Sequence, residues 1–78
     1  MLDLKEVLYG IARAIVDNPD EVKVTESEDD DIITLTLNVA ESDMGLVIGR
    51  QGRIAKAIRT VMKAAASTVC KKVNVEIR

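Results

Sequence analysis

Two glycines, Gly49 and Gly52, enclose the dipeptide Arg50-Gln51 and directly precede a long run with helical spacing. Glycine has no side chain, so the chain can adopt left-handed dihedral angles there and another backbone can approach closely. The start of the following helix adds unpaired N–H groups and the positive end of the helix dipole at the same place. The spacing therefore predicts a loop that binds phosphate, where Arg50 and Arg53 would add positive charge.

Basic residues are concentrated in and after this loop. Residues 1–43 carry a net charge of −9 and residues 44–78 carry +7, although the whole chain has a net charge of only −2. Lys56 and Arg59 extend the positive charge of the loop along the helix that follows. Such asymmetry favours an anionic partner for the basic half, the alternative being electrostatic complementarity between two halves of one fold.

The loop does not fit the two common nucleotide-binding motifs. A Walker A loop ends in Gly-Lys-Ser/Thr, whereas Gly52 is followed by Arg53-Ile54. A dinucleotide-binding fingerprint requires Gly-x-Gly-x-x-Gly, and Gly45, Gly49 and Gly52 have a different spacing. The sequence therefore indicates neither kind of site.

Catalytic and metal-binding chemistry has little support in the composition. The chain has no histidine, and Cys70 is its single cysteine, which excludes an intrachain disulfide and any Ser-His or Cys-His catalytic pair. Asp29-Asp30-Asp31 is interpreted as a solvated turn rather than a metal site, because it lacks the spacing and the glycine of a calcium loop. Cys70 is interpreted as a small buried side chain, with a reactive thiol as the alternative. We therefore expect no enzyme, no cofactor and no metal.

The elements that must position the loop follow from the spacing of apolar residues. Intervals of three and four predict helices, and strict alternation predicts strands. Pro19 ends the first helix, because proline cannot continue the hydrogen-bond ladder. The predicted elements are, in order, a helix at residues 2–16, a strand at 22–25, an acidic turn at 28–31, a strand at 33–39, a capped helical turn at 42–48, a helix at 53–68 and a strand at 72–78.

This order predicts an α+β fold. Three strands with one apolar face each need cover, and three helices with one apolar stripe each supply it. The last strand follows two helices, so it can lie parallel to its neighbour through a crossover. We expect a single domain over residues 1–78, a two-layer α-β-β-α-α-β arrangement with a mixed three-stranded sheet covered by three helices. The apolar stripe of the long helix is predicted to contain Ile54, Ala57, Ile58, Val61, Met62 and Ala65.

The loop and the element order together resemble a known family. The run from Val47 to Arg59, Val-Ile-Gly-Arg-Gln-Gly-Arg-Ile-Ala-Lys-Ala-Ile-Arg, is similar to the signature of the KH domain, whose Gly-x-x-Gly loop clamps about four nucleotides by their backbone. The element order is that of the type II, prokaryotic arrangement of this fold. Over essentially the whole chain, the sequence resembles the KhpA family of small stand-alone bacterial KH-domain proteins, which bind RNA.

The resemblance implies a site and a set of partners. The implied RNA-binding residues are Ile48, Gly49, Arg50, Gln51, Gly52, Arg53, Lys56 and Arg59. The implied ligand is single-stranded RNA, with single-stranded DNA as an alternative, and the implied protein partner is a second copy or a KhpB/Jag-like KH protein. A cytoplasmic location, an RNA chaperone activity and a role in cell shape and cell-wall homeostasis are further implications.

Two positions depart from the family pattern. Ala55 stands three residues after the second glycine, where many KH domains have isoleucine or leucine, and Leu46 stands where many relatives have lysine or arginine. A smaller apolar wall and a missing charge would both weaken binding and reduce base selectivity. We therefore expect weak binding by one copy.

Other RNA-binding folds, a membrane protein and a protein-interaction domain are the alternatives to a KH domain. RRM, OB and cold-shock domains stack bases on aromatic side chains, and Tyr9 is the single aromatic residue here. No apolar stretch is long enough to span a bilayer, and the first residues lack a signal-peptide pattern, so we expect a soluble intracellular domain without membrane association. The remaining alternative is a protein-interaction domain that dimerises through its first helix and edge strands and binds little nucleic acid.

Overall fold

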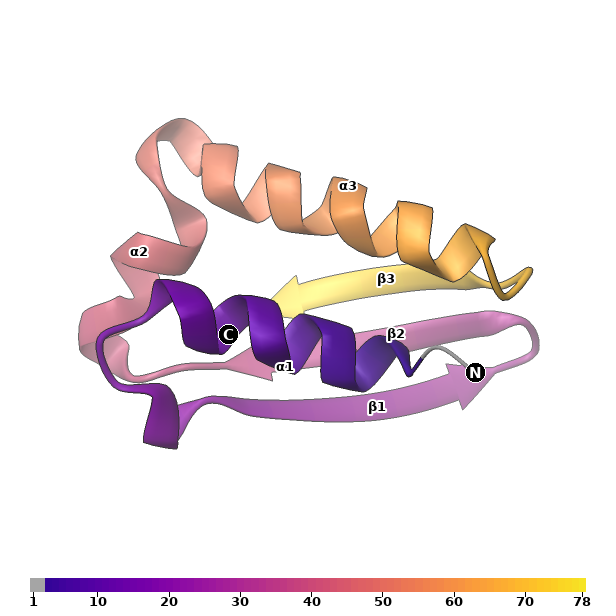
Figure 1. Cartoon of the computed structure of the whole chain (residues 1–78), viewed down its shortest axis with the longest axis horizontal. Helices are drawn as coiled ribbons and strands as arrows, with labels where there is room; N and C mark the ends of the chain where they lie inside the picture. The colour runs from indigo at the N-terminus through magenta and orange to yellow at the C-terminus, as the bar shows by residue number, and fades with distance from the viewer. Residues whose placement is uncertain (1–2) are drawn as a thin grey trace.

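The computed structural model describes residues 3–78 and has the predicted α-β-β-α-α-β order, with three short 3₁₀ helices in addition (Figure 1). The predicted start of the first helix at residue 2 lies outside the described residues. The elements are α1 (Leu4–Ile15), η1 (Pro19–Glu21), β1 (Lys23–Asp29), β2 (Ile32–Asn38), η2 (Glu41–Asp43), α2 (Met44–Ile48), η3 (Arg50–Gly52), α3 (Arg53–Ser67) and β3 (Lys72–Ile77).

The three strands form one mixed sheet in the order β1-β2-β3. β1 and β2 are antiparallel, and β2 and β3 are parallel, with Leu35 opposite Glu26 on one side and opposite Val75 on the other. Alternate residues of β2 are buried on the helix side, namely Ile33, Leu35 and Leu37. The predicted α+β class and mixed three-stranded sheet are therefore confirmed.

The hairpin between β1 and β2 is longer than predicted. Glu28 and Asp29 belong to β1, so the turn contracts to Asp30-Asp31, where Asp30 has a φ of 56°. Val22, which was expected to begin the strand, is instead buried next to η1. Seven consecutive residue pairs hold the hairpin in register, which shows that cross-strand hydrogen bonding extends into a segment whose acidic composition favours a turn.

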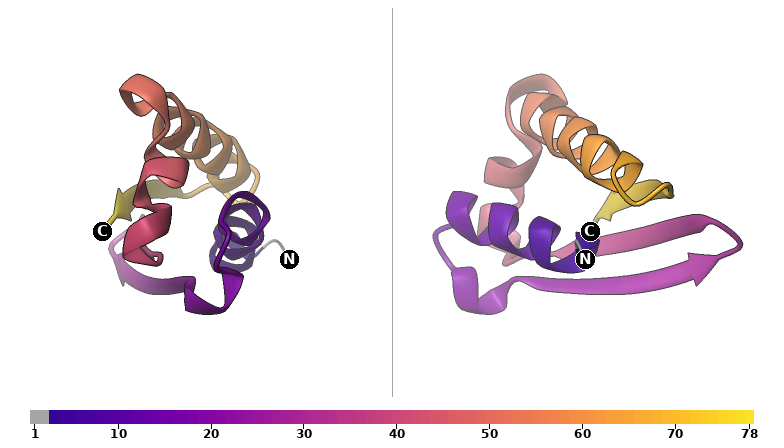
Figure 2. Two further views of the ribbon diagram at one scale, coloured as in Figure 1. Left: turned by 90° about the vertical axis from the view of Figure 1, so that its left-hand side faces the viewer. Right: turned by 45° about the vertical axis from the view of Figure 1, so that its right-hand side comes forward.

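α1 and α3 lie side by side on one face of the sheet (Figure 2). Asp3 caps α1 by accepting hydrogen bonds from the backbone N–H groups of Lys5 and Glu6. Leu8 of α1, Met62 of α3 and Leu35 of β2 are completely buried in the shared core. Among residues 3–78, no helix combines the length and apolar character that a bilayer crossing requires.

The apolar stripe predicted for α3 is partly wrong. Its buried residues are Ala55, Ile58, Met62 and Ala66, whereas Ile54, Ala57 and Val61 are exposed. α3 packs against β3, α1 and α2 and leaves its outer side to solvent, so apolar residues that extend around the helix cannot all be covered. Consequently α3 presents an apolar strip to solvent beside its buried face.

The interpretation of Cys70 as a buried side chain is also wrong. Cys70 is exposed and has a φ of 57°, in the turn that connects α3 to β3. Its N–H donates to the Ser67 carbonyl at 3.2 Å, which closes the last turn after α3. The turn reverses the chain before β3 begins, and its outer residues face solvent.

Candidate nucleic-acid interface

The loop between α2 and α3 consists largely of left-handed backbone. Gly49 has φ 75° and ψ 175°, Gln51 has φ 56° and ψ 27°, and Gly52 has φ 74° and ψ 14°. The Gly49 N–H donates to the Gly45 carbonyl at 2.9 Å, and the Gly52 N–H donates to the Gly49 carbonyl at 3.2 Å. The loop is therefore a single tight turn joined to the end of α2 and the start of α3.

The two glycines are required for different reasons. A Cβ atom at Gly49 would lie 2.8 Å from the Cβ atom of Ile54 and 2.9 Å from its backbone nitrogen, which is closer than real Cβ atoms approach. A Cβ atom at Gly52 would meet nothing within 4 Å. Gly49 thus lets the loop pack against α3, whereas Gly52 leaves open space in front of the loop.

Exposed basic side chains surround this open space. Arg50, Arg53 and Lys56 are exposed, and none of them forms an ion pair among residues 3–78. No side chain of residues 3–78 caps the N-terminus of α3, and the Arg53 N–H donates to the Arg50 carbonyl. The N–H groups that follow it in the first turn can therefore bind a ligand. The ion pairs of the described residues are Lys71 with Glu28 at 2.6 Å and Arg78 with Glu76 at 3.1 Å. Within residues 3–78, only the Lys71–Glu28 ion pair joins the acidic half of the chain to the basic half, so most basic side chains are not engaged by such pairs.

Arg59 has a different environment from the other predicted site residues. Its Nε donates to the backbone carbonyl of Val75 on β3 at 3.3 Å. In β3 the N–H groups of Lys72 and Arg78 donate to the carbonyls of Asp31 and Leu37, next to and within β2. Every second residue of β3 therefore bonds to β2, and the residues between them, including Val75, direct their backbone groups toward the free edge of the sheet. Arg59 therefore links α3 to the free edge of the sheet.

Apolar side chains complete the surface next to the loop. Ile48 at the end of α2 is 40% exposed, and Ile54 in the first turn of α3 is 38% exposed. Leu46, within α2, is 41% exposed. Ala55 is buried, so that position contributes no apolar wall to the surface. The exposed apolar side chains near the loop are therefore those of Leu46, Ile48 and Ile54.

Asp43 holds this end of the molecule together, a role that sequence reasoning missed. Its carboxylate accepts hydrogen bonds from the Asn18 N–H at 3.0 Å, the Asn18 Nδ2 at 3.1 Å and the Asp17 N–H at 3.3 Å. The sequence suggested a cap for the helical turn at residues 42–48, but Asp43 makes no capping hydrogen bond to α2. It instead fixes α2, and with it the loop, to the segment that follows α1.

The structure thus gathers most of the predicted site at one end of α3. Residues 48–53 and Lys56 lie on the loop and the first turn of α3, and Arg59 lies farther along toward β3. Tyr9 belongs to α1, where the guanidinium carbon of Arg13 lies 5.3 Å from the centre of its ring. Within residues 3–78 no group of three or more His, Cys, Asp or Glu side chains is placed to hold a metal ion.

Comparison with known sequences identifies a family of the same length. The family model described as "KhpA/KhpB, KH domain" matches residues 5–77. The RNA-binding protein KhpA of Clostridium acetobutylicum is 58% identical over 74 residues, which are 95% of this chain and 99% of the relative. The RNA-binding protein KhpA of Bacillus subtilis is 47% identical over 74 residues, which are 95% of this chain and 91% of the relative.

Comparison with solved structures identifies the same fold within a larger protein. A crystal structure of Aquifex aeolicus Era bound to GDP.AlF4− matches 95% of this chain with a TM-score of 0.71 and 19% identity. Era in complex with MgGDPNP and nucleotides 1506–1542 of 16S ribosomal RNA matches with a TM-score of 0.69 and 16% identity. The chain spans 29% and 28% of the length of these two proteins, so the likeness concerns the fold alone.

Proposed function

The chain belongs to the KhpA/KhpB KH-domain family, and from this premise we propose that it binds single-stranded RNA through the loop at Gly49–Gly52. The observation that carries the proposal is the open space in front of Gly52, beside the uncapped start of α3 and the unpaired side chains of Arg50 and Arg53. A sugar–phosphate backbone can approach the loop there because no side chain stands in the way.

Binding divides between phosphate contacts and base contacts. Arg50, Arg53 and the N–H groups that follow Arg53 in the first turn of α3 hold phosphates, which positions the strand but carries no sequence information. Ile48 and Ile54 offer aliphatic surface on which bases can lie, and Lys56 and Arg59 add charge along the strand. The surface lacks aromatic stacking partners, so we expect little preference among short sequences.

Weak binding by one copy favours a dimer as the functional unit. Exposed apolar residues recur along the outer side of α3 at helical spacing, and Val61 at the centre is 48% exposed. The large exposed apolar residues are Ile32, Leu46, Ile48, Ile54 and Val61, none of which is on α1. We therefore place the contact with a second copy, or with a KhpB/Jag-like KH protein, on α3 rather than on the first helix. Two linked modules gain effective concentration on one strand without new contacts.

The cellular role follows as part of this proposal. A domain that binds many short single strands weakly can hold RNA segments apart without fixing them, which suits an RNA chaperone or a post-transcriptional regulator in the cytoplasm. The role in cell shape and cell-wall homeostasis suggested by the family resemblance would then act through the RNAs that are bound. No catalytic step belongs to this proposal.

A loop variant tests the proposed function directly. Replacing Arg50 and Gln51 by aspartate removes one positive charge and puts two carboxylates in front of the phosphates. We expect the variant to stay folded, because both side chains are exposed, and to lose RNA binding. The matched control is Lys5→Glu with Gly10→Glu on α1, which changes the net charge equally at two other exposed positions. A folded loop variant that binds RNA as well as this control would refute the clamp.

The dependence of affinity on salt separates RNA binding from the protein-interaction alternative. With about two or three phosphate contacts, the slope of log affinity against log salt should be roughly −1.4 to −2 for single-stranded RNA. The exposed Val61 favours the alternative, since an apolar α3 surface can serve protein association alone. A salt slope near zero, together with self-association that persists in high salt, would support a protein-interaction domain that binds little nucleic acid.

A further inference from the structure

The side chain of Ile54, in the first turn of α3, lies directly against Gly49, the first residue of the loop. A Cβ atom added to Gly49 would stand 2.8 Å from the Cβ atom of Ile54, and that added atom is one bond away from the Gly49 Cα. The Ile54 side chain is therefore in van der Waals contact with the backbone of Gly49. It fills the space that a side chain on residue 49 would take.

The backbone of the loop does not hold its conformation by itself. Gly49 and Gly52 have φ values of 75° and 74°, and glycine populates other conformations about as readily. Gln51 has a φ of 56°, which is unfavourable for a residue with a side chain. Within the loop, the Gly52 N–H donates to the Gly49 carbonyl at 3.2 Å. A contact from outside the turn therefore helps to keep the loop in one conformation.

Ile54 is suited to supply that contact. It is branched at Cβ, and such a side chain has one strongly preferred χ1 rotamer in a helix, so its position is well defined. Ile54 is 38% exposed, which means that most of its surface is covered, yet it does not belong to the core shared by the helices and the sheet of residues 3–78. The covered part of Ile54 therefore serves the loop more than the packing of the whole domain.

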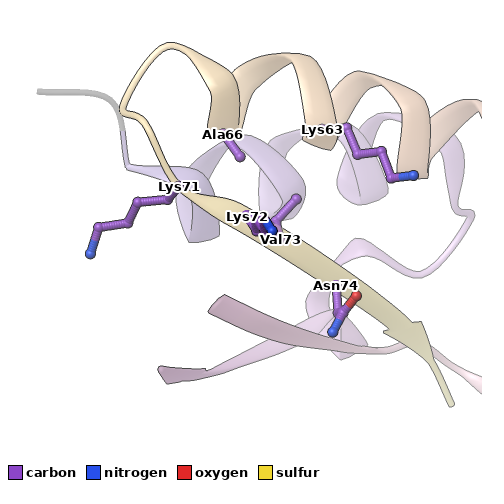
Figure 3. A pocket seen from close by; sticks show the side chains of 6 residues that line it. All are labelled: Lys63, Ala66, Lys71, Lys72, Val73 and Asn74. Carbon is purple, nitrogen blue, oxygen red and sulfur yellow. The ribbon is translucent and has the colours of Figure 1, made fainter. Parts of the chain in front are cut away.

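The far half of α3 does not offer a comparable place for a phosphate. A hollow of about 300 Å³ lies between α3 and β3 and is lined by Lys63, Ala66, Lys71, Lys72, Val73 and Asn74 (Figure 3). Lys71 extends away from the hollow in Figure 3, and the alternation of buried and exposed residues in β3 places Lys72 and Asn74 on the other face of the sheet. These polar groups do not converge, so the shape of the glycine loop decides how the sugar–phosphate backbone is held.

We propose that Ile54 is a positioning residue for RNA binding, which holds the loop in its binding conformation by packing against Gly49. This inference rests on the proposed function, because it concerns the same loop. A loop that already has its bound conformation loses less conformational freedom when the strand binds, and affinity rises without a further contact to the ligand. Positioning of this kind acts on any strand with a sugar–phosphate backbone, whereas the aliphatic surface of Ile54 acts only on bases.

Three substitutions test this role. Ile54→Ala removes the contact with Gly49, and Ile54→Val keeps the branched Cβ and with it most of the contact. The matched control is Ile32→Ala, because Ile32 is 41% exposed and loses the same atoms. Ile32 begins β2 at the hairpin turn, which lies at the opposite end of the molecule from the loop (Figure 1).

Each protein is titrated, by NMR, with two strands of about four nucleotides, a length that one KH module engages. One strand is single-stranded RNA, and the other is the same sugar–phosphate backbone without bases. We expect Ile54→Ala to bind both strands about three- to tenfold more weakly than the wild type, and Ile54→Val to bind both within about twofold of it. Ile32→Ala should bind both strands as the wild type does.

The outcomes separate this inference from the proposed function. A loss confined to the strand with bases would overturn the positioning role, because Ile54 would then act only as a surface for bases, and the proposed function would stand. Equal binding by Ile54→Ala and Ile32→Ala would overturn the positioning role in the same way. A wild type that bound neither strand would overturn the proposed function, and this inference with it.

Native-state hydrogen exchange tests the loop in the absence of RNA. Exchange at the Gly52 N–H reports opening of the loop, since this group donates to the Gly49 carbonyl. Ile54→Ala should speed exchange at Gly52 by about threefold or more and leave exchange at the buried Leu35 unchanged, whereas Ile54→Val should restore the wild-type rate at Gly52. Equal acceleration at Gly52 and Leu35 would overturn the inference, because Ile54 would then contribute only to the stability of the whole domain.

Discussion

Arg59 and Val75 join the helix that follows the glycine loop to the free edge of the sheet. The Nε of Arg59 donates to the Val75 carbonyl at 3.3 Å, from the middle of α3 to the middle of β3. The carbonyl has no strand partner, because the alternate residues of β3 are the ones that bond to β2. This contact adds a polar link between α3 and β3 to the apolar packing of Ile58, Met62 and Val73 in the shared core.

Removing this contact should reduce stability measurably. Arg59→Gln is expected to lower the free energy of unfolding by about 1 kcal/mol, because the Val75 carbonyl loses its donor. The matched control is Arg53→Gln, which removes the same charge from an exposed side chain without a recorded hydrogen bond and should change stability by less than ~0.5 kcal/mol. Urea denaturation of both variants measures the difference. Equal stabilities would show that the contact contributes nothing in solution.

Gly49→Ala should destabilise the fold. The added Cβ atom would stand 2.9 Å from the backbone nitrogen of Ile54, and the left-handed φ of 75° is unfavourable for alanine. Strain and overpacking together predict a loss of about 2–4 kcal/mol in the free energy of unfolding. Gly10→Ala is the control, since Gly10 lies within α1 with open space around it. This substitution should raise the free energy of unfolding by about 0.5–1 kcal/mol, because alanine favours the helix more than glycine does. A melting temperature of Gly49→Ala equal to the wild type would contradict the close packing.

Gly52→Asp should leave the protein folded and remove RNA binding. The position has open space for a side chain, so the main structural cost is the left-handed backbone, about 1–2 kcal/mol. The carboxylate would occupy the space that the proposal gives to a phosphate. Gly52→Asn has nearly the same shape without the charge and tolerates the left-handed region better.

Comparison of the two substitutions separates charge from shape. We expect affinity for single-stranded RNA to fall at least tenfold in Gly52→Asp and less in Gly52→Asn, as measured by fluorescence anisotropy. If both variants bound like the wild type, backbone approach at this loop would be excluded.

Asp43→Ala should destabilise the end of the molecule that carries the loop. The change leaves the N–H groups of Asp17 and Asn18 without their acceptor, and Asp43 itself is only 1% exposed. Loss of hydrogen bonds to a buried carboxylate predicts a decrease of about 2–4 kcal/mol in the free energy of unfolding. Glu41→Ala is the control, because that carboxylate is exposed and its side chain makes no hydrogen bond to any of residues 3–78. Native-state hydrogen exchange at Asn18 would report the effect locally, and unchanged protection would contradict this role.

The sequence was informative wherever local chemistry decides the structure. The helical spacing predicted a first helix that ends at residue 16, and α1 ends at Ile15. The alternation of Ile33, Leu35 and Leu37 defined a one-sided strand, and two glycines marked a tight turn before a helix. Each of these features depends on the residue itself and its near neighbours, so spacing alone predicts them. The same reasoning placed residues 49–52 in a loop between a helical turn and a long helix, where the structure has them.

Long-range contacts decided the rest. The sequence contains a broad apolar band on the helix at residues 53–68, but which part is buried depends on the direction from which the sheet and α1 approach. Packing covers Ala55, Ile58 and Met62 and leaves Val61 exposed. Asp43 lies 25 positions from Asn18, and Arg59 lies 16 positions from Val75, so no local sequence pattern predicts either hydrogen bond. The order of the elements and the loop were thus determined by the sequence itself. The exposed side of α3 and the fixed position of α2 were decided by tertiary packing, because each requires groups that are brought together only when the helices pack on the sheet.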